Sequence, residues 1–274
     1  MPTFSFPSKT FVLGEYAILQ NGRALLLAHG PNFEVSTEKT RTKPAFHAES
    51  AAGKASRLIG VDLRTLEFRD PHQGKGGFGG SGAEFLSVLA AKKNNPGNEA
   101  FAWEAWDLYK KLGCTGSGAD LLAQGSTTSA ALLYVDLNQR KLNFFPLGKL
   151  GIQATLFHTG RKLPTHVHLE EKSALNVKIL TQIADQGILA CSEGKTAIFL
   201  DSVRAYEKEL ARLDLVAGHS AAALKSLDRI KEVLAAKGCG AMGSDVLLVC
   251  SAKKIDLSDW AEYHSLVEVA SLPI

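Results

Sequence analysis

The sequence predicts an α/β (α+β) protein built as two domains. Short runs of β-branched and aromatic residues, broken by glycines, fill the opening segment and are typical of strands joined by tight turns. Six glycines occupy nine positions over residues 74–82, and an amphipathic helical pattern follows at once. From residue 151 a new strand pattern begins, and helical stretches follow it. We therefore expect one domain over residues 1–150 and a second over residues 151–274.

Strand patterns in the first half are separated by glycines or end in turns. The predicted strands are 10–13, 16–19, 33–36 and 131–135, with a hairpin return over 141–150. One helix is expected directly after the glycines, where Phe85 to Leu89 place apolar side chains on a single face. Another helix is expected to begin near Asn98 and to end at Gly113, because glycine is a common C-terminal cap.

The second half is expected to alternate between strands and helices. A strand over 153–157 is followed by helical stretches around 171–190, 196–213 and 219–237, and a strand over 245–250 comes last. No internal repeat or long polar linker interrupts the sequence, so we expect the two domains to pack tightly.

Composition excludes several classes of protein. The 274 residues are 45% hydrophobic and 22% charged, which is close to the globular average and unlike disordered or collagen-like chains. The net charge of +3 comes from interspersed basic and acidic residues, so no nucleic-acid partner is expected. No apolar run approaches the ~20 residues of a membrane-spanning helix, and the N-terminus lacks a signal-peptide pattern. We expect a cytoplasmic monomer or homodimer that binds a small molecule and no membrane.

The glycine-rich segment at residues 74–82 has the features of a phosphate-binding loop. Glycines let backbone N–H groups approach an anion, and the helix that follows directs the positive end of its dipole to the same place. The segment matches G-x-G-x-x-G, which is a weak signal alone, whereas the Walker pattern is absent from it. The alternative is a flexible surface loop, although flexible linkers seldom run straight into an amphipathic helix.

Four segments together resemble the motifs of the GHMP kinases. Residues 7–19, PSKTFVLGEYAIL, are similar to the first motif, a P-G-K stretch that ends in G-E-[HY]-A. Residues 77–83, GFGGSGA, resemble the phosphate loop G-L-G-S-S-[AG]-A. Residues 240–245, GAMGSD, resemble the third motif G-A-G-G-G-D, and residues 116–120, GSGAD, resemble the segment that supplies the active-site aspartate. Their order and rough spacing agree over the whole chain.

This resemblance implies a two-domain GHMP kinase-like fold with the active site in the cleft between the domains. It also implies ATP and Mg²⁺ as cofactors and transfer of the γ-phosphoryl group to a small acceptor. The ATP phosphates would lie against Gly77, Gly79, Gly80, Ser81, Gly82 and Ala83. Catalysis would depend on Asp120, Lys9 and Lys75, and Mg²⁺ binding on Ser81 and Glu84. The residues expected at the acceptor are Glu15, Tyr16, Ser117, Arg161, Lys162, Gly240 and Asp245.

Three details resemble phosphomevalonate kinases within that family. The first motif reads G-E-Y-A, with Tyr16 where mevalonate kinases usually carry histidine. Lys75 stands two positions before Gly77, as in their K-x-G-L-G-S-S pattern, and residues 159–165 resemble their T-G-x-x-A-S-T segment. The departures from the family motifs are Ser8, Gly80, Met242 and Ser244.

Phosphomevalonate is therefore the acceptor that we expect, and mevalonate or another GHMP kinase acceptor is the alternative. A second alternative is a catalytically inactive relative that senses a metabolite, because Gly80, Met242 and Ser244 alter the motifs. A nicotinamide oxidoreductase would require a parallel βαβ unit around residues 74–82. An ATP-dependent decarboxylase related to these kinases is a further alternative.

Several of these side chains also have a structural interpretation. Asp120 would suit a helix N-terminus, and Glu84, expected in the first turn of its helix, would complement the helix dipole. Arg161 and Lys162 could form a solvated turn. The histidines at 166 and 168 have no third ligand nearby in sequence, so we expect them on the surface rather than at a metal.

Overall fold

The computed structural model describes residues 3–37, 41–93, 96–161 and 176–274, which form two compact units. The first unit consists of Met1–Lys9, Ala28–Gly74 and Phe78–Ala130. The second consists of Thr10–Leu27, Lys75–Gly77 and Ala131–Ile274. Each unit takes several segments from the first half of the sequence, so the units interleave along the chain. The expected domain boundary at residue 150 stays a prediction.

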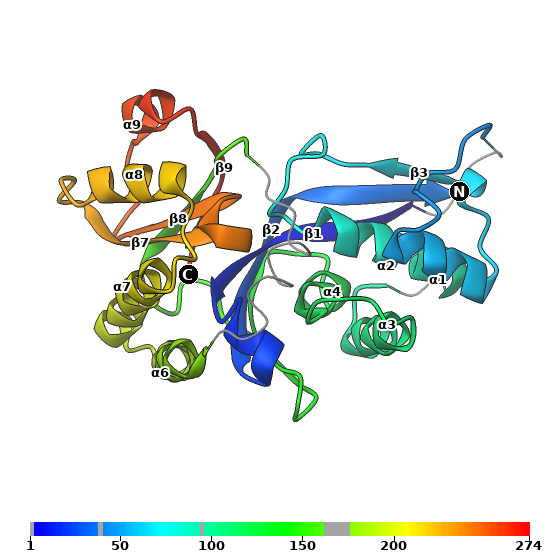
Figure 1. The fold of residues 1–274 in the computed structure, drawn as a ribbon, viewed down its shortest axis with the longest axis horizontal. Helices are drawn as coiled ribbons and strands as arrows, with labels where there is room; N and C mark the ends of the chain where they lie inside the picture. The colour runs from blue at the N-terminus through cyan, green and yellow to red at the C-terminus, as the bar shows by residue number, and fades with distance from the viewer. Residues whose placement is uncertain (1–2, 38–40, 94–95, 162–175) are drawn as a thin grey trace. The chain divides into compact units, whose positions relative to one another are not determined.

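One of the two sheets is built mainly from the first half of the chain (Figure 1). Its strands are β1 (Thr3–Leu13), β2 (Arg23–Thr37), β3 (Leu66–Arg69), β4 (Ala131–Asp136) and β5 (Lys141–Phe145). Their order is β1-β2-β4-β5, and β3 pairs with β2 in antiparallel fashion. β4 and β5 form an antiparallel hairpin, as the sequence predicts. The strands predicted at 10–13, 33–36 and 131–135 are also confirmed.

The helices of the first unit follow the glycine and cap signals. They are α1 (Ala51–Ile59), α2 (Gly80–Lys93), α3 (Glu99–Lys111) and α4 (Ala119–Gly125). α1 packs against α2, and α3 packs against α4. The side chain of Asn98 accepts the N–H of Phe101 at 3.0 Å, so it satisfies a donor that the start of α3 leaves unpaired. The two helices predicted in this region are confirmed as α2 and α3.

The second unit contains an antiparallel sheet with the order β7-β8-β6-β9. Its strands are β6 (Gln153–His158), β7 (Val233–Cys239), β8 (Val246–Ser251) and β9 (Val267–Pro273), and its helices are α6 (Lys178–Glu193), α7 (Thr196–Arg212), α8 (Gly218–Leu227) and α9 (Ser258–Tyr263). Phe157, Leu247 and Val249 of the sheet share one apolar cluster with Leu224 and Leu227 of α8. Among the described helices of both units, none is long and apolar enough to cross a membrane.

Two predicted elements differ from the structure. The strand predicted over 16–19 is a 3₁₀ helix, η1 (Ala17–Gln20), because the N–H of Leu19 bonds to the carbonyl of Tyr16 at 3.1 Å and closes a turn of three residues. The helix predicted over 219–237 ends at Leu227, and residues 233–239 form β7 instead. Pairing with β8 overrides the helix-forming tendency of its alanines and leucine. The helix predicted over 171–190 begins at Lys178, and residues 171–175 lie outside the described residues.

A buried histidine on β2 stays neutral in the core of the first unit. His29 is fully buried, and its Nδ1 donates to the carbonyl of Gly30 at 2.7 Å. Its ring stands edge-on to the ring of Phe78, with 5.7 Å between the centroids. Burial lowers the pKa of His29 to about 4, against the raising effect of the Gly30 hydrogen bond, and the charges of His72 and Lys9 lower it further.

We predict that this histidine makes the protein less stable in acid. The unfolded side chain binds a proton near pH 6.5 and the folded one only near pH 4, so lowering the pH favours the unfolded chain. Between pH 7 and pH 5 the contribution of His29 to the free energy of unfolding should fall by about 2 kcal/mol. His29→Asn keeps an N–H donor for Gly30 but does not titrate, so its urea unfolding should vary less with pH by about that amount. The same pH dependence in both proteins would contradict a neutral His29.

Candidate active site

The glycine-rich loop passes from one compact unit to the other. Lys75–Gly77 belong to the second unit, and the chain from Phe78 onward belongs to the first. Gly77 has a φ of +91° and Gly79 a φ of +87°, a region of backbone conformation that favours glycine. α2 begins at Gly80, where the first N–H groups of a helix have no partner within the helix. The predicted loop that leads into a helix is therefore confirmed.

The part of the loop in the second unit lies against β6 and the segment before β8. The imidazole Nε2 of His158 lies 3.2 Å from the carbonyl of Gly76 and must donate to it, because a carbonyl only accepts. A Cβ added at Gly77 would lie 2.6 Å from the Cβ of Asp245. Burial lowers the pKa of His158, opposed by its bond to Gly76, and the charge of Lys75 lowers it further. The exposed side chain of Lys75 is therefore close enough to His158 for its charge to act on that ring.

The part of the loop in the first unit is backed by a glutamine of α4. A Cβ added at Gly79 or Gly82 would lie 2.7 or 2.6 Å from the Oε1 of Gln124. Gln124 is fully buried, and its Nε2 donates to the carbonyl of Pro7 at 2.8 Å. Among the described residues, its Oε1 has no hydrogen-bond partner. Close packing against Gln124 therefore requires glycine at positions 79 and 82, whether or not a phosphate binds there.

Asp120 lies in the first turn of α4 and faces the start of α2. A Cβ added at Gly82 would lie 3.0 Å from the Oδ2 of Asp120, which is half-buried. Gly118, in the left-handed conformation with a φ of +75°, caps α4 without a side chain. Ser117, two residues before α4, accepts the N–H of Ala119 at 3.2 Å through its hydroxyl. The structure thus brings Asp120 of α4 and Gly82 of α2 together.

The other residues predicted at this end of α2 lie on and beside the helix. Ser81 is exposed and Glu84 is half-buried, and their spacing of three places both on one face of α2. The helix has no acidic residue in its first turn, so the expectation that Glu84 lies there is wrong, because the helix begins as early as Gly80. Ala83 is buried, and the half-buried Lys9 donates its backbone N–H to the carbonyl of Phe78 at 3.0 Å.

Glu15 forms a buried ion pair in the second unit. The Nζ of Lys237 lies 2.6 Å from the Oε1 of Glu15, and the lysine side chain is fully buried. Removing one member of such a pair would leave an uncompensated charge in the core. Sequence reasoning missed Lys237 because it fell in a predicted helix, although a single lysine among apolar residues was a possible signal. The role of Glu15 at the acceptor stays a prediction.

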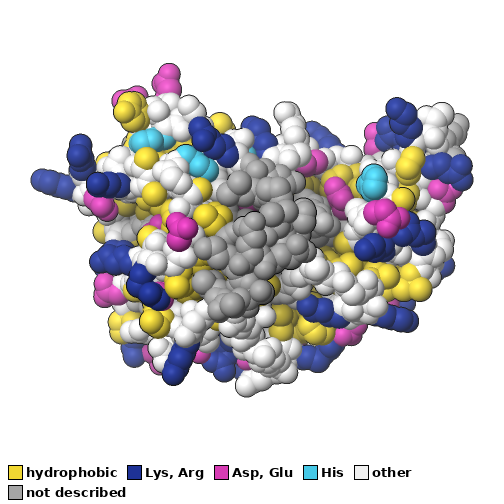
Figure 2. Space-filling model, in the orientation of Figure 1, with side chains coloured by type: hydrophobic (Ala, Val, Ile, Leu, Met, Phe, Trp, Pro, Cys, Tyr) yellow, Lys and Arg dark blue, Asp and Glu magenta, His cyan; other side chains and the backbone are white. Residues whose placement is uncertain are grey.

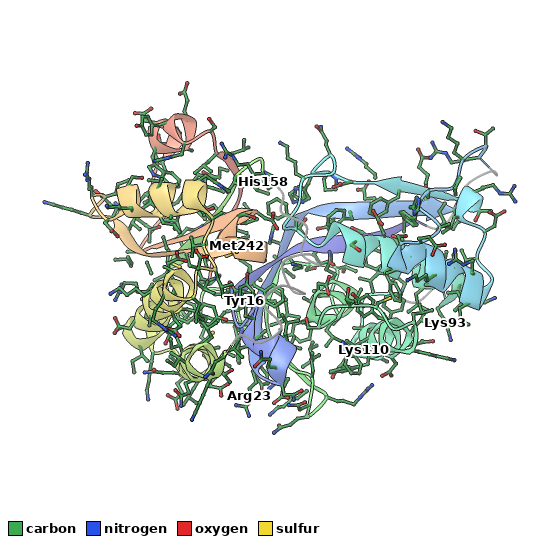
Figure 3. The ribbon with its side chains drawn as sticks, viewed as in Figure 1. Tyr16, Arg23, Lys93, Lys110, His158 and Met242 are labelled. Carbon is green, nitrogen blue, oxygen red and sulfur yellow. The ribbon has the colours of Figure 1, made fainter. Side chains whose placement is uncertain are left out.

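Tyr16 joins the first motif to the third (Figure 3). The backbone N–H of Met242 donates to the Tyr16 hydroxyl at 2.9 Å, and Tyr16 is buried. Burial raises the pKa of this phenol well above its usual value, so it stays protonated. Met242 has a φ of +56°, which shows that the substituted third motif still forms a left-handed turn. A Cβ added at Gly240 would lie 2.7 Å from the Oδ2 of Asp245.

Of the two remaining residues expected at the acceptor, the structure describes only Arg161, which follows β6. Arg161 is exposed three residues after His158, whereas Lys162 and the histidines at 166 and 168 lie outside the described residues. Thr159 donates its hydroxyl to the carbonyl of Ser244 in the third motif. Among the described residues, no group of three or more His, Cys, Asp or Glu side chains could hold a metal ion.

Comparison with solved structures identifies the fold. Phosphomevalonate kinase from Streptococcus pneumoniae, in complex with phosphomevalonate and AMPPNP, matches with a TM-score of 0.79 at 17% identity, over 100% of both chains. Mevalonate kinase from Methanococcus jannaschii matches with a TM-score of 0.73 at 12% identity, over 100% of this chain and 98% of that chain. Galactokinase from Lactococcus lactis, complexed with galactose, matches with a TM-score of 0.72 at 12% identity, over 99% of this chain and 93% of that chain.

These matches confirm the resemblance to the GHMP kinases as a likeness of fold. No protein-family model matches the sequence, and no curated protein matches it. The nicotinamide alternative is wrong, because it needs a parallel βαβ unit around residues 74–82. The strand before the loop, β3, is antiparallel to β2, and α2 leads into α3 rather than into a strand.

We predict that Gly82 and Gly80 differ sharply in their tolerance of alanine. Gly82→Ala would push a methyl group against Gln124 and Asp120, and overpacking of this kind costs about 1–3 kcal/mol in the free energy of unfolding. Gly80→Ala is the matched control, because the nearest atom, in the ring of Phe33, is 3.7 Å away. Urea denaturation of both variants measures the difference. Equal stability of the two variants would refute the packing of Gln124 behind the loop.

Proposed function

We propose that this protein is an ATP-dependent small-molecule kinase of the GHMP type. One observation carries the proposal: the carboxylate of Asp120 faces Gly82 at the start of α2, directly after a glycine loop with left-handed residues. A fold likeness to kinases, one of them solved with AMPPNP, supports it. The chemistry that such a site performs is transfer of the γ-phosphoryl group from ATP to an acceptor.

The residues of the loop fit a nucleotide phosphate. Gly79 and Gly82 have no space for a side chain, and Gly77 and Gly79 have left-handed backbones. The phosphates would lie against these glycines and Gly80. N–H groups at the start of α2 and the helix dipole both favour an anion at this place. We assign the ATP phosphates to these N–H groups, with the charges of Lys9 and Lys75 to balance them.

Mg²⁺ would be held beside the phosphates. The exposed hydroxyl of Ser81 and the carboxylate of Glu84 lie on one face of α2, and oxygen atoms are the ligands that Mg²⁺ prefers. Bound there, the ion would neutralise charge on the phosphate oxygens.

Asp120 would serve the acceptor. Its carboxylate would orient the acceptor or accept a proton from it while the acceptor oxygen bonds to the γ-phosphorus and ADP leaves. Asp120 lies in the first turn of α4, where the helix dipole interacts favourably with an acidic side chain.

Phosphomevalonate is the acceptor that we favour, and mevalonate or another acceptor of these kinases is the alternative. Support comes from Tyr16 in the first motif and from the basic residues Lys75 and Arg161 in the second unit. Release of ADP measured over phosphomevalonate, mevalonate, galactose and sugar phosphates would identify the acceptor. A protein that binds ATP but releases no ADP with any of them would instead support the metabolite sensor, which the altered third motif around Met242 keeps open.

We predict that Asp120→Asn lowers turnover by about 10²–10⁴-fold, because it keeps the shape of the side chain but removes the base. Folding should be unchanged, as measured by the thermal unfolding midpoint. Asp228→Asn, an exposed position after α8, is the matched control and should keep wild-type turnover. Near-normal ADP release by the Asp120 variant would defeat its assignment.

A further inference from the structure

The last turns of α3 hold the backbone of residues 115–117, the segment that leads into α4. The indole Nε1 of Trp106 donates to the carbonyl of Ser117 at 2.9 Å. The Nζ of Lys110, one turn further along α3, donates to the carbonyl of Gly116 at 2.8 Å (Figure 3). Side chains of α3 therefore satisfy two neighbouring carbonyls that lie just before the helix of the proposed catalytic aspartate.

Tyr109 makes a third contact of this kind and also reaches α2. Its hydroxyl donates to the carbonyl of Thr115, and its ring stands edge-on to the ring of Phe85, with 5.5 Å between the centroids. Phe85 lies on α2 three residues after Gly82, and Gly82 is the position that faces the carboxylate of Asp120. The segment before α4 and the helix that begins at the glycine loop are thus both packed against α3.

The segment held by α3 has little stiffness of its own. Gly116 has a φ of +99° and Gly118, the cap of α4, a φ of +75°. Glycine loses more conformational freedom on folding than any other residue, so contacts from outside the segment are needed to fix it. The indole of Trp106 also limits the space here, because a Cβ added at Gly118 would lie 2.8 Å from its Cδ1.

The charge of Asp120 acts on the same side chains of α3. Burial raises the pKa of the Tyr109 phenol well above its usual value, and the negative charge of Asp120 raises it further. Burial lowers the pKa of Lys110, whereas the charges of Asp120 and Cys114 raise it. The phenol therefore keeps the hydrogen that it donates to Thr115, and Asp120 lies near enough for its charge to reach both side chains.

We propose that these three side chains of α3 position the carboxylate of Asp120 through the backbone of residues 115–118. Trp106, Tyr109 and Lys110 are positioning residues, since they act through Asp120. The proposal rests on the proposed kinase function, in which Asp120 is aligned with the acceptor. Misplacing a reacting group by about 1 Å can lower a rate ~100-fold. Because the ATP phosphates are assigned to the loop and the start of α2, losing these contacts should affect turnover more than ATP binding.

The first test removes one contact at a time. Trp106→Phe keeps an aromatic ring but loses the N–H donor, and Lys110→Met keeps the aliphatic chain but loses the ammonium. Each should lower kcat for ADP release about tenfold, with KM for ATP little changed. Lys110→Arg, which keeps a donor, should recover most of the lost turnover. Wild-type kcat in both Trp106→Phe and Lys110→Met would overturn the proposal.

Two matched controls separate positioning from a general loss of stability. Figure 2 shows Lys and Arg side chains that stand out from the surface, and the exposed Lys111, next to Lys110 on α3, supplies the control Lys111→Met. Trp260→Phe removes an indole donor in the second unit, where Nε1 donates to the hydroxyl of Ser226 at 2.8 Å. Both controls should keep wild-type kcat. An equal fall of kcat in Trp260→Phe and Trp106→Phe would assign the effect to stability and overturn the proposal.

A second test places Trp106→Phe in the Asp120→Asn background. Residues that act as one unit have effects that are not additive, so the added change should lower kcat by less than about twofold once the carboxylate is gone. A further fall of about tenfold would show that Trp106 acts independently of Asp120, which would overturn the proposal.

Amide hydrogen exchange gives a readout that does not depend on turnover. The N–H of Ala119 bonds to the hydroxyl of Ser117, the residue whose carbonyl Trp106 holds. Trp106→Phe should speed exchange of this amide by about fivefold or more, and Trp260→Phe should leave it unchanged. Unchanged exchange in Trp106→Phe, with an active wild type, would overturn this proposal alone. A wild type that releases no ADP with any acceptor would defeat the proposed function and this proposal with it.

Discussion

The absence of side chains at three positions of the glycine loop is the constraint on which the candidate site depends. Gly77 leaves room for Asp245 in the second unit, and Gly79 and Gly82 leave room for the amide of Gln124 in the first. Each part of the loop is therefore packed closely against residues of its own unit. The missing side chain at Gly82 also leaves room for Asp120 at the start of α2. The same close packing therefore sets both the geometry of the loop and the position of the proposed base.

Inside the second unit, buried polar contacts connect the first motif to the third. Glu15 pairs with Lys237 on β7, and Tyr16 holds the turn at Met242, which leads to Asp245. Buried charges and hydroxyls are costly unless they are paired, so each of these contacts also restricts the backbone that carries it. The substitutions at Met242 and Ser244 are accommodated in this arrangement, since the amide of one and the carbonyl of the other make hydrogen bonds that do not depend on the side chain.

The sequence was most informative where local signals and tertiary packing agree. The glycine-to-helix transition at Gly80, the cap of α3 and the hairpin of β4 and β5 all follow from patterns within a few residues. β7 was missed because its leucine and alanines favour a helix locally, and only pairing with β8 makes it a strand. The partners of Gln124 and Lys237 could not be identified, because Pro7 and Glu15 are 117 and 222 residues away in the sequence.

The central claim is that the loop and the start of α2 bind nucleotide phosphates. The most direct measurement is an NMR titration of the full chain with Mg²⁺ and a nonhydrolysable ATP analogue, because glycine amides resonate apart from most others. The account predicts saturable shifts that are largest at Gly79, Gly80 and Gly82. Binding of the analogue with no change at these three amides, or no binding at millimolar concentration, would contradict it.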